Sequence, residues 1–439
     1  MPRAKIASPT PERFRLQNGL DVILHSVPSS PTASVWVWYR VGSRNEWPGV
    51  TGASHWVEHM LFQGSPRYGK GEMDRAIVSV GGVLNAFTDT DFTTYFSIVP
   101  REHLRVPLDI EADRMTRALI DPAEVERERT IIHSEREGNE NWPEFRADEE
   151  LYALAFRVHP YRWDPLGFRT DIERLTAEDL AKYYRRFYGP QNATLVVSGG
   201  FEADDLRARL PSAFGGLPAV GDDPSVQVIE PPARGERRTT LTGPGTTPFL
   251  HIGWRGPAFR EAATPALVLL DTILGGENRF FSANQSWFRS QEHPSSRLFQ
   301  KLVVPGLAVR AGSEWRPRVD PGLFVIHAQA APGIRLDRLE AALFAELEQL
   351  GRRGPSRQEL EDARTKVRRG AELAYESASR SGFRLGYFAT MGLKPSESEL
   401  YNAVLSLRAP AVQRAAAELF RDEQRVVVRY EPNSEGASD

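Results

Sequence analysis

The chain contains no cysteine among its 439 residues. Disulfide bonds and thiolate metal sites are therefore excluded, and any zinc site must use histidine and carboxylate ligands. Without cysteine, the composition also gives no indication of the redox compartment in which the protein works.

Long apolar runs are absent as well. No stretch approaches the roughly 18 consecutive apolar residues that indicate a membrane-spanning helix. Residues 1–5, Met-Pro-Arg-Ala-Lys, lack the apolar core of a signal peptide. We therefore expect no membrane span and a cytoplasmic location, with the prior removal of an export signal as the alternative.

The sequence has no excess of charge of one sign, because its formal net charge is −3 at pH 7. This balance gives no electrostatic reason to expect a nucleic-acid partner. Hydrophobic residues make up 41% of the chain, which is enough to form packed cores. A chain of this length exceeds what one core supports, so we expect at least two domains.

Periodicity predicts alternating strands and helices in the first half. Apolar alternation indicates strands over residues 33–41, 83–87, 93–99 and 192–197. Thr176 is a predicted N-cap, with Asp179 at the capping-box position. Helical spacing predicts helices over residues 53–62, 72–80, 104–119, 122–139 and 176–187.

The second half repeats this order at low similarity. Residues 215–237 are rich in Pro, Gly and Asp without a clear period, and indicate an interdomain linker. We expect an α+β protein of two homologous domains, residues 1–222 and 223–439. The expected elements after the linker are a strand at 249–254, helices at 265–276, 336–350 and 356–377, and a closing strand at 425–430.

The segment His55-Trp56-Val57-Glu58-His59 is the most informative in the chain. Residues four apart share one face of a helix, so both imidazoles can reach one ion, and Glu58 lies on the same side. This is the zincin arrangement in reversed order, H-x-x-E-H. The alternative is an ordinary pair of surface histidines that match the pattern by chance.

A catalytic zinc site typically takes three protein ligands and one water molecule, so a third ligand is required. The helix predicted at 122–139 supplies several glutamates, and spacing alone does not choose among them. They are Glu124, Glu126, Glu128, Glu135 and Glu137.

The inverted motif, together with the segment 126–135 (Glu-Arg-Glu-Arg-Thr-Ile-Ile-His-Ser-Glu), resembles the pitrilysin/insulinase metallopeptidase family, M16. In that family the third ligand lies 76 or 77 residues after the second histidine, which implies Glu135 here. The resemblance also implies one Zn²⁺ per subunit and catalysis by Glu58. It assigns Glu128, seven residues before Glu135, to orienting a ligand or to proton handling.

The resemblance implies a mostly antiparallel sheet covered by helices in each domain, arranged as half of a clam. Residues 81–88 are similar to the family's substrate-binding edge strand, which would place Asn85, Ala86 and Phe87 against an extended peptide. The alternative for this segment is an ordinary hairpin.

The second half departs from the family pattern in residues 296–309. Val303 and Val309 stand where active relatives carry an Arg and a Tyr that bind substrate and steady the oxyanion. Valine has no hydrogen-bond donor in its side chain. We expect a homologous subunit to supply the pair, with a heterodimer favoured over a homodimer. The alternative is substitution by Arg380 and Tyr387, which have the same seven-residue spacing.

Residues 277–294 look like an insertion relative to compact family members. They carry four aromatic residues, which either belong to a surface loop or pack on a partner and restrict the chamber mouth. The aromatic residues are Phe280, Phe281, Trp287 and Phe288.

Together these features predict a zinc-dependent endopeptidase of the small bacterial type, similar to the mitochondrial-processing-peptidase subfamily. It would cleave extended peptides inside a chamber formed with a homologous subunit. One alternative is a non-catalytic structural subunit like the core proteins of respiratory complexes. Another is a zinc-binding module without hydrolysis, in which Glu58 would have no task.

Overall fold

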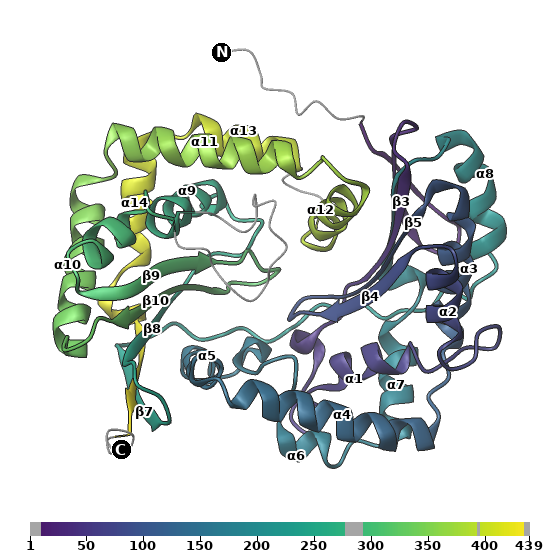
Figure 1. Ribbon diagram of the computed structural model, residues 1–439, viewed down its shortest axis with the longest axis horizontal. Coiled ribbons are helices and arrows are strands. Elements are labelled where there is room, and N and C mark those ends of the chain that lie inside the picture. The colour runs from purple at the N-terminus through teal and green to yellow at the C-terminus, as the bar shows by residue number, and fades with distance from the viewer. Residues whose placement is uncertain (1–9, 277–292, 393–395, 434–439) are drawn as a thin grey trace.

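The computed structural model describes residues 10–276, 293–392 and 396–433. The chain forms two halves, each built on one β-sheet with helices on its outer face (Figure 1). The predicted α+β fold with two related halves is confirmed. The boundary at residue 222 stays a prediction.

The first sheet has six strands in the order β1-β2-β6-β3-β5-β4. β2 and β6 are parallel, and all other neighbours are antiparallel. β4 lies at the edge of the sheet. The strands are β1 (Glu12–Arg15), β2 (Asp21–Ser26), β3 (Thr32–Tyr39), β4 (Val83–Thr88), β5 (Thr93–Pro100) and β6 (Ala193–Gly199).

The second sheet has the order β7-β11-β8-β10-β9, with only β7 and β11 parallel. This reproduces the order β2-β6-β3-β5-β4 strand for strand, so the repeat detected in the sequence is confirmed in the topology. The strands are β7 (Arg237–Gly243), β8 (Phe249–Arg255), β9 (Ala308–Trp315), β10 (Leu323–Ala330) and β11 (Val426–Pro432).

The order of the helices agrees in part: five helices separate β5 from β6, and five separate β10 from β11, whereas α8 follows β6 and no described helix follows β11. Those of the first half are α1 (Ala53–Met60), α2 (Glu72–Ser79), α3 (Arg105–Arg117), α4 (Pro122–Glu140), α5 (Pro143–Ala155), α6 (Arg169–Ile172), α7 (Ala177–Phe187) and α8 (Ala203–Phe214). Those of the second half are α9 (Thr264–Gly275), α10 (Leu336–Arg353), α11 (Arg357–Leu373), α12 (Ala378–Thr390), α13 (Glu397–Ser406) and α14 (Ala409–Leu419).

Two local expectations about helix ends have different outcomes. The capping box at the start of α7 is confirmed, since Thr176 and Asp179 bond reciprocally. The helix predicted over 356–377 is present as α11, but its predicted end lies too far along the chain. α11 ends at Leu373, and Ser377 starts α12 by accepting a hydrogen bond from the Arg380 N–H. An N-cap serine competes with helical continuation in this way.

β3 is buried on both faces, because successive side chains of a strand point to opposite sides of the sheet. Val35 and Val37 belong to the core formed with helices of the first half. Trp36 and Trp38 point the other way and join the core of the second half.

Each half contributes one helix that packs on the sheet of the other half, and one of these two helices covers the tryptophans. α12, from the second half, packs on β3 and β6 of the first sheet, while α5, from the first half, packs on β7, β8 and β11 of the second. Figure 1 shows α12 beside the first sheet and α5 beside the base of the second. Ala147 and Leu151 of α5 share one apolar cluster with Phe249 and Val428.

Glycines on α12 permit its close approach to the first sheet. Gly382 and Gly386 are one helical turn apart and face Trp36 and Trp38. A Cβ on Gly386 would overlap the indole nitrogen of Trp38, which is fully buried. The helix therefore has no room for a larger residue at this position.

We expect Gly386→Ala to destabilise the protein by about 1–3 kcal/mol, the usual range for overpacking a core. This loss should appear although Gly→Ala in a helix interior normally gains about 1 kcal/mol. Gly351→Ala in α10 is the matched control, because its added methyl would meet Ala417 at an ordinary 3.4 Å. Thermal unfolding followed by circular dichroism should separate the two variants. Equal melting temperatures would contradict the packing of α12.

The segment predicted as a linker is irregular between α8 and β7, and it lies fixed against the first half. The carboxylate of Glu230 accepts hydrogen bonds at 2.8–2.9 Å from the backbone N–H groups of Arg157, Val158 and His159.

None of the helices within the described ranges is long and apolar enough to cross a membrane.

Candidate metal centre

Helix α1 begins after a tight turn that ends at Gly52, whose φ is +88°. Here glycine is needed, because an L side chain rarely adopts this conformation. The buried carboxylate of Glu46 accepts hydrogen bonds from the N–H groups of Gly52 (2.9 Å) and Ser54 (2.8 Å). Glu46 therefore satisfies donors at the first turn and fixes where the helix starts.

The structure brings His55, His59 and Glu135 together, as predicted from the resemblance. One ligand atom from each residue lies within 4.8 Å of the other two. Oε2 of Glu135 is 3.5 Å from Nε2 of His55 and 3.7 Å from Nε2 of His59. The glutamate comes from α4, which packs beside α1.

Glu128, also on α4, fixes the orientation of His59. Its Oε2 is 2.9 Å from Nδ1 of His59, and its Oε1 accepts a hydrogen bond of 2.8 Å from the Gln63 amide. An Nδ1–H bonded to a carboxylate leaves Nε2 free to act as a metal ligand. The position of Glu128 thus suits the orienting role that the resemblance implies.

Glu58 lies next to these side chains but bonds elsewhere. It is 8% exposed, and its Oε2 accepts a hydrogen bond of 2.6 Å from the Thr88 hydroxyl at the end of β4. Burial raises the pKa of Glu58 to about 7, although the bond from Thr88 acts in the opposite direction. A carboxylate with a pKa in this range can both accept and return a proton near neutral pH.

The two histidines have different environments. Burial, with a smaller effect from His59, lowers the pKa of His55 to about 3, so its ring is neutral at neutral pH. Burial also disfavours the charged form of His59, but the bond with Glu128 and the nearby carboxylates outweigh it and raise the pKa. His55 is therefore ready to offer a lone pair, whereas metal binding at His59 must displace a proton in part of the population.

The donor set fits zinc better than calcium or magnesium. Two imidazole nitrogens and one carboxylate oxygen are typical zinc ligands, whereas the two alkaline-earth ions prefer oxygen alone. Nδ1 of His55 is also buried and makes no hydrogen bond within the described part of the chain. The other ring nitrogen, Nε2, faces Glu135, so within the described residues the His55 ring has no orienting partner like the one that Glu128 provides for His59.

The three predicted substrate-binding residues lie on the edge strand β4, and their side chains differ in role. The Asn85 side chain accepts a hydrogen bond of 2.8 Å from the Ala86 N–H. Phe87 packs against Trp38, Phe92 and Phe383. Asn85 is exposed on this edge strand, whereas Ala86 and Phe87 are half-buried.

The residues that depart from the family pattern are placed as follows. Val303 ends a short helical turn at 299–303, and Val309 lies on β9 with 43% exposure. The alternative pair lies on α12: Tyr387 is buried and donates to the Pro317 carbonyl, and Arg380 pairs with Glu376. A buried, bonded tyrosine is not poised to contact a substrate. The aromatic insertion lies outside the described residues, except for His293 and Pro294.

Sequence reasoning missed Glu46, Gln63 and Thr88. Glu46 precedes α1 in an irregular segment, and nothing in its spacing marks it as a cap. Thr88 ends a predicted strand, but only the folded arrangement shows that its hydroxyl meets Glu58. The one signal in the sequence was that Thr88 is a polar residue at the end of a predicted strand.

Fold and site together define a two-domain metallopeptidase architecture. The chain belongs to the insulinase family of peptidases, M16: the family model "Insulinase (Peptidase family M16)" matches residues 21–164, and "Peptidase M16 inactive domain" matches residues 174–367. Both halves of the chain are thus accounted for by one family.

Individual relatives agree with this assignment. The chain is 28% identical over 434 residues to zinc protease PqqE of Helicobacter pylori, covering 97% of this chain and 93% of that protein. It is 25% identical to a probable mitochondrial-processing peptidase subunit beta of Arabidopsis thaliana, covering 97% and 79%. The crystal structure of a protease from Helicobacter pylori matches with a TM-score of 0.88 and 27% identity, covering 97% and 100%.

Proposed function

We propose that the protein is a zinc-dependent endopeptidase that cleaves extended peptides. The observation that supports this most directly is the convergence of His55, His59 and Glu135 within 4.8 Å, with the buried carboxylate of Glu58 beside them. The relative from Helicobacter pylori named a zinc protease supports the same activity.

In this proposal His55, His59 and Glu135 hold the zinc ion, which supplies Lewis-acid activation of water and of the scissile carbonyl. Glu58 accepts a proton from the attacking water at its carboxylate and passes it to the leaving amine nitrogen. Glu128 keeps the His59 ring in the orientation that presents Nε2.

The edge of β4 is the proposed binding site for the peptide. An extended segment can add to this edge through main-chain hydrogen bonds, which select shape more than sequence. The N–H of Ala86 would exchange its bond with the Asn85 side chain for one with the peptide. The strand leads directly to Thr88 and hence to Glu58.

We further propose that a homologous subunit completes the active site. The side chains of Val303 and Val309 cannot donate a hydrogen bond to a substrate carbonyl, and the loss of an oxyanion donor typically costs about 10²–10³ in rate. The subunit would carry the missing Arg and Tyr and enclose a chamber with this chain, and a heterodimer is favoured. The second candidate function, a non-catalytic structural subunit, is favoured only by these two valines.

Zinc content and peptide cleavage decide between the two functions. The purified chain, alone and with a homologous subunit that carries the Arg and Tyr, would be assayed on an unstructured fluorogenic peptide and on a folded protein. We expect about one zinc per chain, cleavage of the peptide only, loss of activity after chelation, and recovery with added Zn²⁺. Full zinc loading without cleavage in either assembly would favour the structural role.

A further inference from the structure

The turn between β4 and β5, residues 89–92, connects the proposed catalytic base to the second half of the molecule. Thr88 enters this turn and donates to Glu58. The turn is tight: the Asp89 N–H donates to the Phe92 carbonyl at 2.8 Å, and the Thr90 N–H donates to the Asp89 side chain. A shift of Asp89 is therefore passed on to Thr88, its neighbour in the chain.

The first half leaves this turn little freedom. The Arg44 N–H donates to the Thr90 carbonyl at 3.0 Å. Gly42 packs so closely that a Cβ there would overlap the carbonyl oxygens of Asp89 and Thr90. One side of the turn is thus held by the backbone that precedes α1.

The other side of the turn is held by residues 318–320 of the second half. Arg318 donates to the carboxylate of Asp89, and the Val319 N–H donates to Oδ2 of Asp91 at 3.1 Å. Side-chain exposure is 10% for Arg318 and 12% for Asp89. Although burial alone would raise the pKa of Asp89, Arg318 and Arg316 lower it to about 2, so the pair is ionised.

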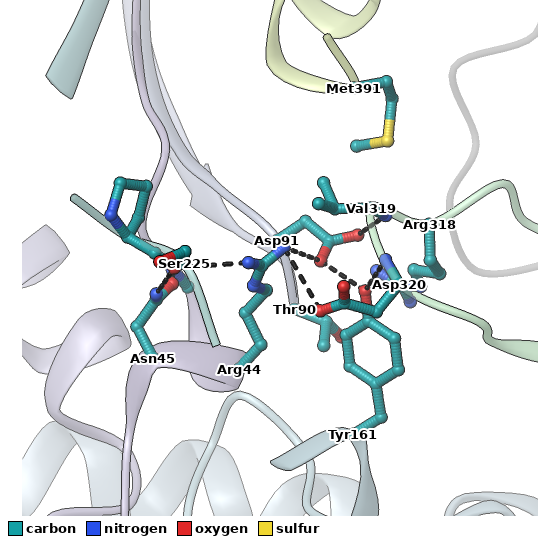
Figure 2. A network of polar contacts seen from close by, with 12 residues as sticks. Arg44, Asn45, Thr90, Asp91, Tyr161, Ser225, Arg318, Val319, Asp320 and Met391 are labelled. Atoms are coloured by element: carbon teal, nitrogen blue, oxygen red, sulfur yellow. Dashed lines mark hydrogen bonds and ion pairs between the residues drawn. The ribbon is translucent and has the colours of Figure 1, made fainter. Parts of the chain in front are cut away.

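Two residues of the first half complete the network. Tyr161 donates to Oδ1 of Asp91 at 2.6 Å and accepts from the Asp320 N–H at 3.0 Å. Arg44 lies 3.5 Å from both Asp91 and Asp320. Figure 2 shows Arg44 and Tyr161 reaching Asp91 from one side and Val319 from the other. We call Arg44, Asp89, Asp91, Tyr161, Arg318 and Asp320 the interdomain clamp.

We infer that the interdomain clamp positions the proposed catalytic base: by fixing the β4–β5 turn, the second half holds Thr88 against Glu58. Arg318 and Tyr161 are then positioning residues that act through Thr88 without touching substrate or metal. The inference rests on the proposed function. It gives the second half of this chain a task in catalysis although that half lacks the Arg and Tyr of active relatives.

The test compares Arg318→Met with the wild type in the assembly that cleaves peptide. We expect kcat to fall about tenfold or more, because misplacing a catalytic group by a fraction of an ångström has effects of this size. The KM and the zinc content should stay unchanged, since neither the β4 edge nor the metal ligands are altered. Arg318→Lys, which keeps a positive charge next to Asp89, should restore part of the loss.

A double-mutant cycle with Thr88→Val shows whether the effect passes through Thr88. Residues that act through one contact give non-additive effects, so Arg318→Met should cost little more in the Thr88→Val background. Additive losses would overturn the inference. If Arg318→Met does not fold, Tyr161→Phe replaces it in the test, because this variant removes one hydroxyl from the clamp. A wild-type kcat in Tyr161→Phe would also overturn the inference.

Asp148→Asn is the matched control. Asp148 on α5 accepts from His251 on β8 at 2.7 Å, so it also joins the two halves, but it does not contact the turn. This variant should retain the wild-type kcat. A loss equal to that of Arg318→Met would show that any weakening between the halves has the same effect, and would overturn the clamp. If the wild-type assembly itself binds zinc but cleaves nothing, the proposed function fails, and the inference fails with it.

Discussion

Glu58→Gln is expected to bind zinc like the wild type and to lose about 10²–10⁴-fold in kcat, the usual contribution of a general base. The amide has nearly the same shape, and its oxygen can still accept the Thr88 hydroxyl, so the local packing is retained. What the variant loses is the ability to take up and return a proton. The measurement is the hydrolysis rate of the fluorogenic peptide together with bound zinc.

The zinc measurement makes this prediction specific. If zinc binding fell together with activity, Glu58 would be supporting the metal and not the proton transfer. If activity survived, the base would have to be assigned to another group, for which Glu128 of α4, which contacts His59, is a candidate. The buried position of Glu58, with its pKa raised to about 7, favours its assignment as the base.

Glu135→Gln is expected to weaken zinc binding strongly and to abolish hydrolysis of peptide. The substitution removes the only carboxylate within the cluster of three potential ligands and leaves two imidazoles, one fewer than the three protein ligands that catalytic zinc sites typically use. Zinc should stabilise the wild type against heat through mass action, and this stabilisation should disappear in the variant. Calorimetric titration of the metal-free protein with Zn²⁺ gives the affinity directly.

Two other glutamates of α4 provide the comparison. Glu137 is exposed and pairs with Arg169 at 3.2 Å, so Glu137→Gln should bind zinc normally. Glu128→Gln should lose about 10–100-fold in affinity, the range typical of residues that orient a ligand. Equal affinities for all three variants would remove the basis for a zinc site that includes Glu135.

The duplication was readable in the sequence because strands and helices have distinct hydrophobic periods. The pattern at 249–254 predicted β8, and that at 425–430 predicted β11, each close to the observed bounds. The exchange of α5 and α12 could not be predicted in this way. An amphipathic helix reveals that it has a buried face, but not which of two similar sheets that face covers.

The cluster of possible ligands was predicted unevenly. Helical spacing paired His55 with His59 on one face, and the family resemblance chose Glu135 among five glutamates. The hydrogen bonds that orient these side chains were not predictable, because they join segments far apart in the chain. Thr88 meets Glu58 across 30 positions, and Glu128 meets His59 across 69.

The exchange of α5 and α12 has a consequence for the integrity of the molecule. Each sheet has one face whose apolar side chains are covered by a helix encoded on the far side of the linker. A single cut in that linker would therefore yield two fragments that remain associated. Produced separately, each fragment would expose a sheet face rich in tryptophan, phenylalanine or valine and would tend to aggregate. We therefore expect the two halves to unfold together, although their sheets have the same strand order.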